Sequence, residues 1–266
     1  MASSATASRK MRGKTVAKNK TRADQLLVAR GLADSRTKAQ ALIMGGHVFA
    51  GDRKVAKAGD LIADEVELTV KGRDHPWVSR GGIKLDHGLN AFGFDVTDAI
   101  ALDVGSSTGG FTDVLLSRGA ARVYAVDVGT NQLAWKLRSD ERVIVHEQTN
   151  ARDLTSGIIA EAPDIIVCDA SFISLAKVLD AALDLASPGA KLVALVKPQF
   201  EAGREEVGKG GVVRDPAVHA RVCDEAAAWV QSKGWRVLGV ETSPITGPEG
   251  NVEFLLGAVK EDVCGD

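Results

Sequence analysis

The sequence predicts an α/β protein in which a doubly wound, seven-stranded, mostly parallel sheet follows a small α+β unit. Three observations support this fold class. From residue 99 onward, short apolar runs alternate with helical patterns, as in parallel sheets covered by helices on both faces. A glycine-rich turn, residues 105–110, follows the first apolar run. Residues 21–70 instead contain two short helical patterns followed by short strands, which indicates a separate unit.

The small unit begins with a predicted helix over residues 24–32, which contains adjacent leucines and closes at Gly31. The Asp34–Ser35 pair caps a second helix, and Gly45–Gly46 ends it. On this second helix the apolar residues share one face. Short strands are then expected at residues 47–50, 54–56 and 65–70.

The larger unit opens with a helix that starts at Arg80. Strands are predicted near residues 100–104, 122–127, 142–145, 164–169, 191–196, 235–241 and 252–259. Helices are predicted near residues 109–118, 131–138, 174–186 and 215–232. The last two strands are joined by a short loop, SPITGPEG, so we expect them to be antiparallel neighbours.

We therefore divide the chain into a basic tail (1–20), a small domain (21–70), a linker (71–79), a large domain (80–260) and a short tail (261–266). Residues 1–22 contain basic side chains and no acid, although the chain as a whole has a net charge of −2. Such a tail often lies along a polyanion. A solvated leader without a role and an organelle transit peptide are the alternatives.

Composition excludes several classes of protein. No apolar run approaches the roughly 20 residues that a membrane span requires. The three cysteines are far apart, so a disulfide framework is not expected and a reducing, cytoplasmic compartment is. No cysteine–histidine spacing of the zinc type occurs, and we expect no metal. We also expect a monomer.

The glycine turn indicates a nucleotide-like ligand. Glycines let the backbone approach a ligand closely, and the helix that follows offers free N–H groups. The turn lacks the GxGxxG spacing of dinucleotide sites, which favours S-adenosylmethionine over NAD. An acid at the end of the second strand commonly binds ribose hydroxyls. The candidate cofactor-binding residues are Asp103, Gly105, Ser106, Ser107, Gly109, Gly110, Asp127 and Asp153. For Asp153, contact with the adenine amino group and a surface capping role remain open.

Four polar residues fall at or near the carboxyl edge of the sheet, where ligands of such sheets bind. Asp169 and Lys197 each follow an apolar strand, Glu253 lies within the last strand, and Lys84 lies on the helix before the first strand. Each could be structural, as a turn cap, a solvated lysine or a simple ion pair. Together they suggest catalysis, because a second ammonium and partial burial favour a neutral lysine, which is a competent general base.

Residues 21–70 resemble the S4-like RNA-binding domain. The resemblance is carried by Arg22, Asp24, Leu27, Ser35, Arg36, Ala39, Ile43, Gly46 and Val48. It implies that basic helix side chains contact RNA phosphates, which set affinity and register. The candidate RNA-binding residues are Arg22, Arg36, Lys38 and Arg80. A solvated surface charge is the alternative for each.

Thr21 to Val259 as a whole resembles the TlyA family of FtsJ-like ribosomal RNA 2′-O-methyltransferases, historically labelled hemolysins. The matching strings are SRGGIKL, LDVGSSTGGFTD, VYAVDVG, VCDASFISL, LVKPQFE, GGVVRD and SPITGPEGNVEFL. The resemblance implies a Rossmann-like S-adenosylmethionine-dependent methyltransferase domain with a catalytic tetrad of Lys84, Asp169, Lys197 and Glu253. It also implies cytidine ribose as the substrate, in the RNA of the small ribosomal subunit, the large subunit or both.

In this interpretation Lys197 is the base, Asp169 orients it, and Lys84 and Glu253 place the ribose hydroxyl. Base N-methylation typically shows an N/D-P-P-Y string where this chain has Asp-Ala-Ser-Phe. Cytosine C5 methylation needs a cysteine in the pocket, but strand alternation should point Cys168 away from Asp169. A non-catalytic ribosome-assembly factor and a membrane-acting cytolysin remain as alternatives from other classes of protein.

Overall fold

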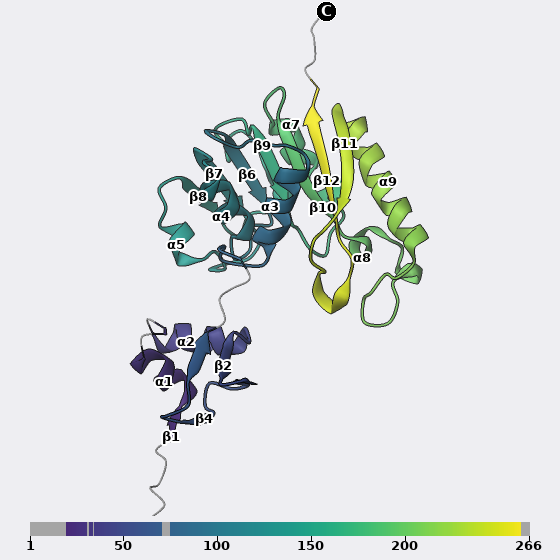
Figure 1. Cartoon of the computed structure of the whole chain (residues 1–266). Helices are drawn as coiled ribbons and strands as arrows, with labels where there is room; N and C mark the ends of the chain where they lie inside the picture. The colour runs from purple at the N-terminus through teal and green to yellow at the C-terminus, as the bar shows by residue number, and fades with distance from the viewer. Residues whose placement is uncertain (1–19, 31, 34, 71–74, 262–266) are drawn as a thin grey trace, which may run out of the picture. The chain divides into compact units, whose positions relative to one another are not determined.

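The computed structural model describes residues 20–30, 32–33, 35–70 and 75–261 of the chain. The chain divides into two compact units, residues 1–74 and residues 75–266 (Figure 1). The basic tail up to residue 19, Gly31, Asp34, residues 71–74 of the predicted linker and residues 262–266 lie outside the described residues. The predictions made for them are therefore not addressed by the structure.

The first unit has its own small apolar core. Helices α1 (Ala23–Ala29) and α2 (Arg36–Met44) pack together, and a three-stranded sheet has the order β3-β2-β5. These strands are β2 (Val48–Ala50), β3 (Arg53–Lys54) and β5 (Leu68–Val70). As predicted, Ser35 caps α2 by accepting a hydrogen bond from the Lys38 N–H, and the helix ends at Gly45. The core contains Leu27, Ala39, Ile43 and Val48.

Two short strands of this unit were not predicted. Strand β1 (Lys20–Arg22) pairs antiparallel with β4 (Leu61–Ala63). Residue 20, which we assigned to the tail, therefore belongs to the first unit. Neither three-residue segment has the alternating apolar pattern of a longer strand, so local sequence gives no sign of the pairing.

The second unit contains the predicted seven-stranded sheet, with the order β11-β12-β10-β9-β6-β7-β8 (Figure 1). Strands β6 to β10 run parallel, while β12 is antiparallel to both of its neighbours, β10 and β11. The strands are β6 (Ile100–Val104), β7 (Arg122–Val126), β8 (Val143–His146), β9 (Ile165–Cys168), β10 (Lys191–Val196), β11 (Trp235–Thr242) and β12 (Phe254–Lys260).

Helices cover both faces of this sheet. On one face, α3 (Gly81–Ala91), α4 (Gly110–Ser117) and α5 (Trp135–Arg138) pack over strand residues such as Ala101 and Val193. On the other, α6 (Leu175–Val178), α7 (Asp180–Leu185) and α9 (Pro216–Ser232) pack over residues such as Leu102 and Leu192. A one-turn helix, α8 (Pro198–Glu201), follows β10. Alternation along each strand thus feeds two separate apolar clusters.

Several helix and strand boundaries of the second unit differ from the prediction. The helix predicted at 131–138 is only α5, because Asn131 has a positive φ and the Gln132 N–H donates to the Glu147 carboxylate. The helix predicted at 174–186 divides into α6 and α7 at Leu179. The last strand starts at Phe254 rather than at residue 252.

The start of the second unit also differs from the predicted linker. Residues 75–79 belong to this unit, and Trp77 and Val78 pack against its apolar cluster. The Val78 N–H donates a 2.8 Å hydrogen bond to the Asp113 carboxylate on α4. The segment before α3 is therefore fixed to the helix that follows the glycine turn.

Candidate active site

The structure brings Lys84, Asp169, Lys197 and Glu253 together at the carboxyl edge of the sheet. The Lys197 Nζ lies 2.6 Å from the Asp169 Oδ1, and the Lys84 Nζ lies 2.5 Å from the Glu253 Oε2. A longer contact of 3.6 Å between Lys84 Nζ and Asp169 Oδ2 joins the two pairs. Two lysine amines and two acidic side chains thus form one connected cluster.

This cluster is largely shielded from bulk water. The side chains of Lys84, Lys197 and Glu253 are 10%, 6% and 1% exposed, and that of Asp169 is 21% exposed. Buried charges must be paired, because an isolated ion loses its hydration. The alternative of a solvated surface lysine therefore does not hold for Lys197.

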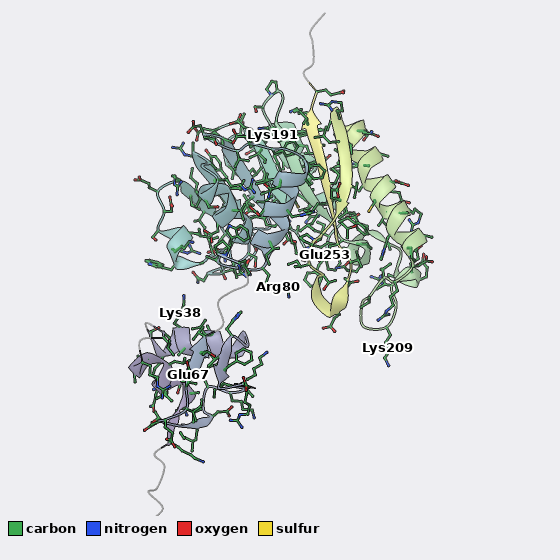
Figure 2. The ribbon with its side chains drawn as sticks, in the orientation of Figure 1. Lys38, Glu67, Arg80, Lys191, Lys209 and Glu253 are labelled. Carbon is green, nitrogen blue, oxygen red and sulfur yellow. The ribbon has the colours of Figure 1, made fainter. Side chains whose placement is uncertain are left out.

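Each of the four residues is positioned by a different element. Asp169 follows β9, Lys197 follows β10 and Lys84 lies on α3. Glu253 immediately precedes β12, in the segment between β11 and β12 (Figure 2). Figure 2 also shows Lys191, which begins β10, at the opposite end of the sheet. The strand ends thus gather these side chains, as the sequence predicts.

The loop between β11 and β12 approaches Glu253 closely. A Cβ atom at Gly247 would lie only 2.2 Å from the Glu253 Oε1, so a larger residue would displace this carboxylate. The loop is also joined to the 208–214 segment by Asn251, whose Nδ2 donates to the Gly211 carbonyl and whose Oδ1 accepts from the Val213 N–H. Backbone geometry and one buried amide therefore fix the position of Glu253.

A cavity of about 410 Å³ opens onto the cluster, which we call the catalytic cavity. It is lined by all four candidate residues, by Arg80, and by the glycine-turn residues Gly105, Ser106, Ser107 and Gly110. Ile245, Thr246 and Gly247 form the wall on the side of the β11–β12 loop. A polar substrate group can therefore reach the ammonium and carboxylate groups from outside.

A second cavity, of about 480 Å³, lies beside the first, and we call it the nucleoside cavity. Its lining contains Asp127 at the end of β7 and apolar side chains such as Val104 and Ile173. Gly105, Ser107, Asp169 and Ser171 line both cavities. A molecule in the nucleoside cavity thus lies beside the candidate residues across this shared wall.

Asp127 has the geometry expected of a ribose-binding acid. Its Oδ2 accepts a 2.8 Å hydrogen bond from the Ser107 N–H, and its Oδ1 accepts a 2.7 Å bond from the Gly129 N–H. Each carboxylate oxygen has a further lone pair, which can accept a hydroxyl proton. The two backbone bonds also tie the glycine turn to the end of β7.

Three predicted cofactor-binding residues do not line either cavity. Asp103 is fully buried beneath the glycine turn, where its Oδ2 accepts hydrogen bonds from the Thr112 N–H and hydroxyl at the start of α4. Gly109 directly precedes α4, has a φ of +92° and lies against the side chain of Leu137. Asp153 is exposed, whereas its neighbours Asn150, Ala151 and Arg152 line the nucleoside cavity.

The structure adds two residues that sequence reasoning missed. The Ser171 Oγ accepts a 2.9 Å hydrogen bond from the Lys197 amine, and Ser171 lines both cavities. Phe172 lines the nucleoside cavity with a φ of +66° and is 90% exposed, with its ring 5.1 Å from that of Phe200. A positive φ at a bulky residue is uncommon, but no sequence pattern reveals it in advance.

Cys168 lies in the apolar core on the far side of its strand and is fully buried. Burial raises the pKa of its thiol to about 12. A thiol that stays protonated at neutral pH is a poor nucleophile. As predicted, this cysteine is part of the core rather than of the pocket.

The candidate RNA-binding residues divide between the units. Arg22 and Arg36 both pair with the buried Asp24 at 3.0 Å, and each remains half-exposed. Lys38 projects from α2 at the surface, and Arg80 is exposed at the rim of the catalytic cavity (Figure 2). The structure thus brings Arg22 and Arg36 together through an acid that our sequence analysis did not single out as a structural partner.

Among the residues that the structure describes, no group of three or more His, Cys, Asp or Glu is arranged to hold a metal ion. No helix in the described part of the chain is long and apolar enough to cross a membrane.

Comparisons with known proteins agree with this architecture. The FtsJ-like methyltransferase family matches residues 77–260, and the S4 domain matches residues 21–67. The chain is 50% identical over 238 residues to the "16S/23S rRNA (cytidine-2'-O)-methyltransferase TlyA" of Mycobacterium tuberculosis, a match that covers 89% of each chain. It is 40% identical over 235 residues to "Hemolysin A" of Brachyspira hyodysenteriae, which covers 88% of this chain and 98% of the relative.

A solved structure has the same overall architecture. It is described as "Putative hemolysin from Streptococcus thermophilus" and superposes with a TM-score of 0.72 at 44% identity. The superposition covers 92% of this chain and 90% of that one. Its coverage includes both units of the present chain.

The site residues fit S-adenosylmethionine. The nucleoside cavity falls within the usual size range of ligand pockets and combines apolar walls with the Asp127 carboxylate. The glycine turn forms part of the wall between the two cavities. A cofactor bound in the nucleoside cavity can therefore present its methyl group to the catalytic cavity. This chain therefore belongs to the FtsJ-like methyltransferase family, with an S4 domain before the methyltransferase domain and S-adenosylmethionine as its cofactor.

Proposed function

We propose that the protein methylates the 2′-hydroxyl of a cytidine ribose in ribosomal RNA. The observation that carries this proposal is the Lys197–Asp169 pair, in which Lys197 lines the catalytic cavity and Asp169 belongs to the wall shared with the nucleoside cavity. A hydroxyl that enters the catalytic cavity meets a lysine amine and a potential methyl donor at the same place. S-adenosylmethionine, when bound, supplies a methyl group that its positive sulfur already activates.

The protein's own residues then have two tasks, to orient the ribose and to remove its proton. Lys197, in its neutral form, is the base, and Asp169 orients its amine. Lys84 and Glu253, which pair with each other at the wall of the catalytic cavity, place the ribose hydroxyl. The glycine turn and Asp127 hold the methionine and ribose parts of the cofactor.

Two observations support ribosomal RNA as the substrate. The S4 domain carries exposed basic side chains on its helices, among them Lys38. The Mycobacterium tuberculosis relative is named for methylation of both 16S and 23S RNA. We propose RNA of the small subunit, the large subunit or both as the target, and a cytoplasmic site of action where ribosomes assemble.

Replacement of the base tests the proposal. Lys197→Ala should lower the rate of methyl transfer to unmethylated ribosomal subunits by about 100-fold or more, because proton transfer to a positioned base contributes that much. Binding of RNA and of S-adenosylmethionine should remain. Transfer is measured with a radioactive methyl donor, and the product is mapped as a 2′-O-methyl group.

Lys191→Ala is the matched control, since Lys191 begins the same strand at its opposite end. This variant should transfer methyl groups at the normal rate. Unchanged transfer by Lys197→Ala would remove that lysine from the mechanism. A normal cellular role for Lys197→Ala without any methyl transfer would instead favour a non-catalytic assembly factor.

A further inference from the structure

The amine of Lys197 has three hydrogen-bond or ionic contacts in the described part of the chain. They are the Asp169 Oδ1 at 2.6 Å, the Asp169 carbonyl at 3.2 Å and the Ser171 Oγ at 2.9 Å. Besides its bond to carbon, an amine nitrogen has three positions for hydrogens or a lone pair. Only two of these contacts have hydrogen-bond geometry, because the Asp169 Oδ1 is in ionic contact with the amine but has no hydrogen-bond partner. Among the described residues, Ser171 therefore provides the side-chain hydrogen bond of this amine.

The three partners differ in whether they can donate or only accept a hydrogen bond. A carboxylate oxygen and a carbonyl oxygen only accept hydrogen bonds, whereas a serine hydroxyl can both donate and accept. When Lys197 is neutral, its lone pair needs a donor. Among the three contacts, only the Ser171 hydroxyl can supply one.

Ser171 is also the partner that a substrate can reach. It lines the catalytic and the nucleoside cavities and is exposed, while the Lys197 side chain is 6% exposed. A hydroxyl in the catalytic cavity can therefore donate to the Ser171 Oγ while that oxygen donates to the Lys197 amine.

The loop that carries Ser171 is held by two contacts with α8. The next residue, Phe172, has a φ of +66° and its ring packs against Phe200 on α8. The Leu175 N–H donates a 2.8 Å hydrogen bond to the Glu201 carboxylate, also on α8. Because α8 directly follows Lys197, these contacts fix the serine relative to the lysine.

We propose that Ser171 is a further catalytic residue, which carries the proton of the ribose hydroxyl to Lys197. This inference rests on the proposed function. As the ribose oxygen bonds to the methyl carbon, the O2′–H bond breaks and its proton moves to the Ser171 Oγ. The original Oγ proton moves to the Lys197 Nζ, which becomes an ammonium. The electron pair of the broken carbon–sulfur bond stays on sulfur, so atoms and charge balance.

The test compares Ser171→Ala with Ser171→Thr in the full-length protein, with unmethylated ribosomal subunits as substrate. The alanine variant should lose about 100-fold in single-turnover rate, the low end of what a proton-transfer group contributes. The threonine variant, which keeps a hydroxyl, should recover most of that loss. Calorimetry should find the same affinity for S-adenosylmethionine in all three proteins, and their thermal unfolding midpoints should agree.

The rate of methyl transfer in mixtures of light and heavy water is a readout that a purely structural role of Ser171 would not change. The wild-type rate should fall along a curve as the deuterium fraction rises, because two protons move together. The remaining rate of Ser171→Ala should fall along a straight line, because one proton then moves directly from the ribose hydroxyl to the Lys197 amine.

Three outcomes would overturn the proposal. Ser171→Ala could keep the wild-type rate, Ser171→Thr could fail to recover it, or the two proton inventories could be identical. Absence of methyl transfer by the wild-type protein is a separate result, since it removes the proposed function itself and the proton path with it.

Discussion

Asp103 is a buried acid that supports the glycine turn from below. Its Oδ2 accepts two hydrogen bonds from Thr112, while its Oδ1 has no hydrogen-bond partner among the described residues. Burial raises the pKa of this carboxyl to about 7, and the nearby Asp169 adds to the shift. The charged form is thus disfavoured in the folded protein.

Asp103 should therefore make stability fall as the pH rises. Its pKa is near 4 in the unfolded chain and about 7 in the folded one, so the folded state binds the extra proton between these values. Its contribution is fully present below pH 4 and is lost by about pH 7, a difference on the order of 4 kcal/mol. Asp103→Asn, which keeps an oxygen for the Thr112 N–H, should remove this dependence.

The measurement is the free energy of unfolding in urea at several pH values from 5 to 8. The variant-minus-wild-type difference should rise with pH and level off above pH 7. Two parallel curves would contradict the assignment.

At the scale of residues, strand ends were enough to predict two members of the charged cluster. Asp169 and Lys197 were found because each follows an apolar run, and parallel strands bring their carboxyl ends to one edge. Ser171 and Phe172 were missed because they lie in a loop whose direction depends on a positive φ and on contacts with α8. Those contacts join segments that are far apart in sequence.

At the scale of elements, the start of α4 depends on one glycine. Gly109 has a φ of +92°, and a Cβ there would lie 2.3 Å from the Leu137 Cδ1 and 2.7 Å from the Leu133 Cδ1. We predicted a cofactor contact for this residue, whereas the structure gives it a packing role. The sequence pattern cannot distinguish a glycine that lines a cavity from one that lies under a helix.

Gly109→Ala should destabilise the second unit by about 2–5 kcal/mol, since backbone strain costs roughly 1–2 kcal/mol and overpacking roughly 1–3 kcal/mol. The control is Gly93→Ala, because Gly93 also has a positive φ, +67°, but has no atom within 4 Å of an added Cβ. That variant should lose only the backbone contribution, about 1–2 kcal/mol. Urea unfolding compares the two, and equal losses would exclude the packing role of Gly109.

Helix and strand boundaries were predicted less well than their order. The residues before α5 follow an irregular path because the Gln132 N–H donates a hydrogen bond to the carboxylate of Glu147, which comes directly after β8 in the sequence. Periodicity describes only what a segment can do locally. It cannot include a hydrogen bond from another part of the chain.

At the scale of the whole molecule, the two units have separate cores and should unfold separately. In the first unit, the buried Asp24 accepts hydrogen bonds from Arg22, Arg36 and Gln40. The Arg22 hydrogen bond lowers the pKa of this carboxyl well below its usual range. Its stabilising effect is therefore present above the ordinary pKa of aspartate, near 4, and is lost as the pH falls below it.

Asp24→Asn should lower the stability of the first unit by about 2 kcal/mol, the scale of hydrogen bonds to a charged group. Calorimetry at pH 7 should show an earlier transition for this unit and an unchanged one for the methyltransferase unit. Glu67→Gln is the control, since Glu67 is an exposed acid of the same unit (Figure 2). A shift of both transitions would mean that the two units unfold together.

The place of β12 in the sheet affects how the molecule matures during synthesis. This strand follows β11 in sequence, but it lies inside the sheet, between β10 and β11, and directly follows Glu253. A nascent chain that has not yet released residue 260 leaves β10 with an open edge and Lys84 without its carboxylate partner. Insertion of the β11–β12 hairpin therefore completes the sheet and the Lys84–Glu253 pair in one step.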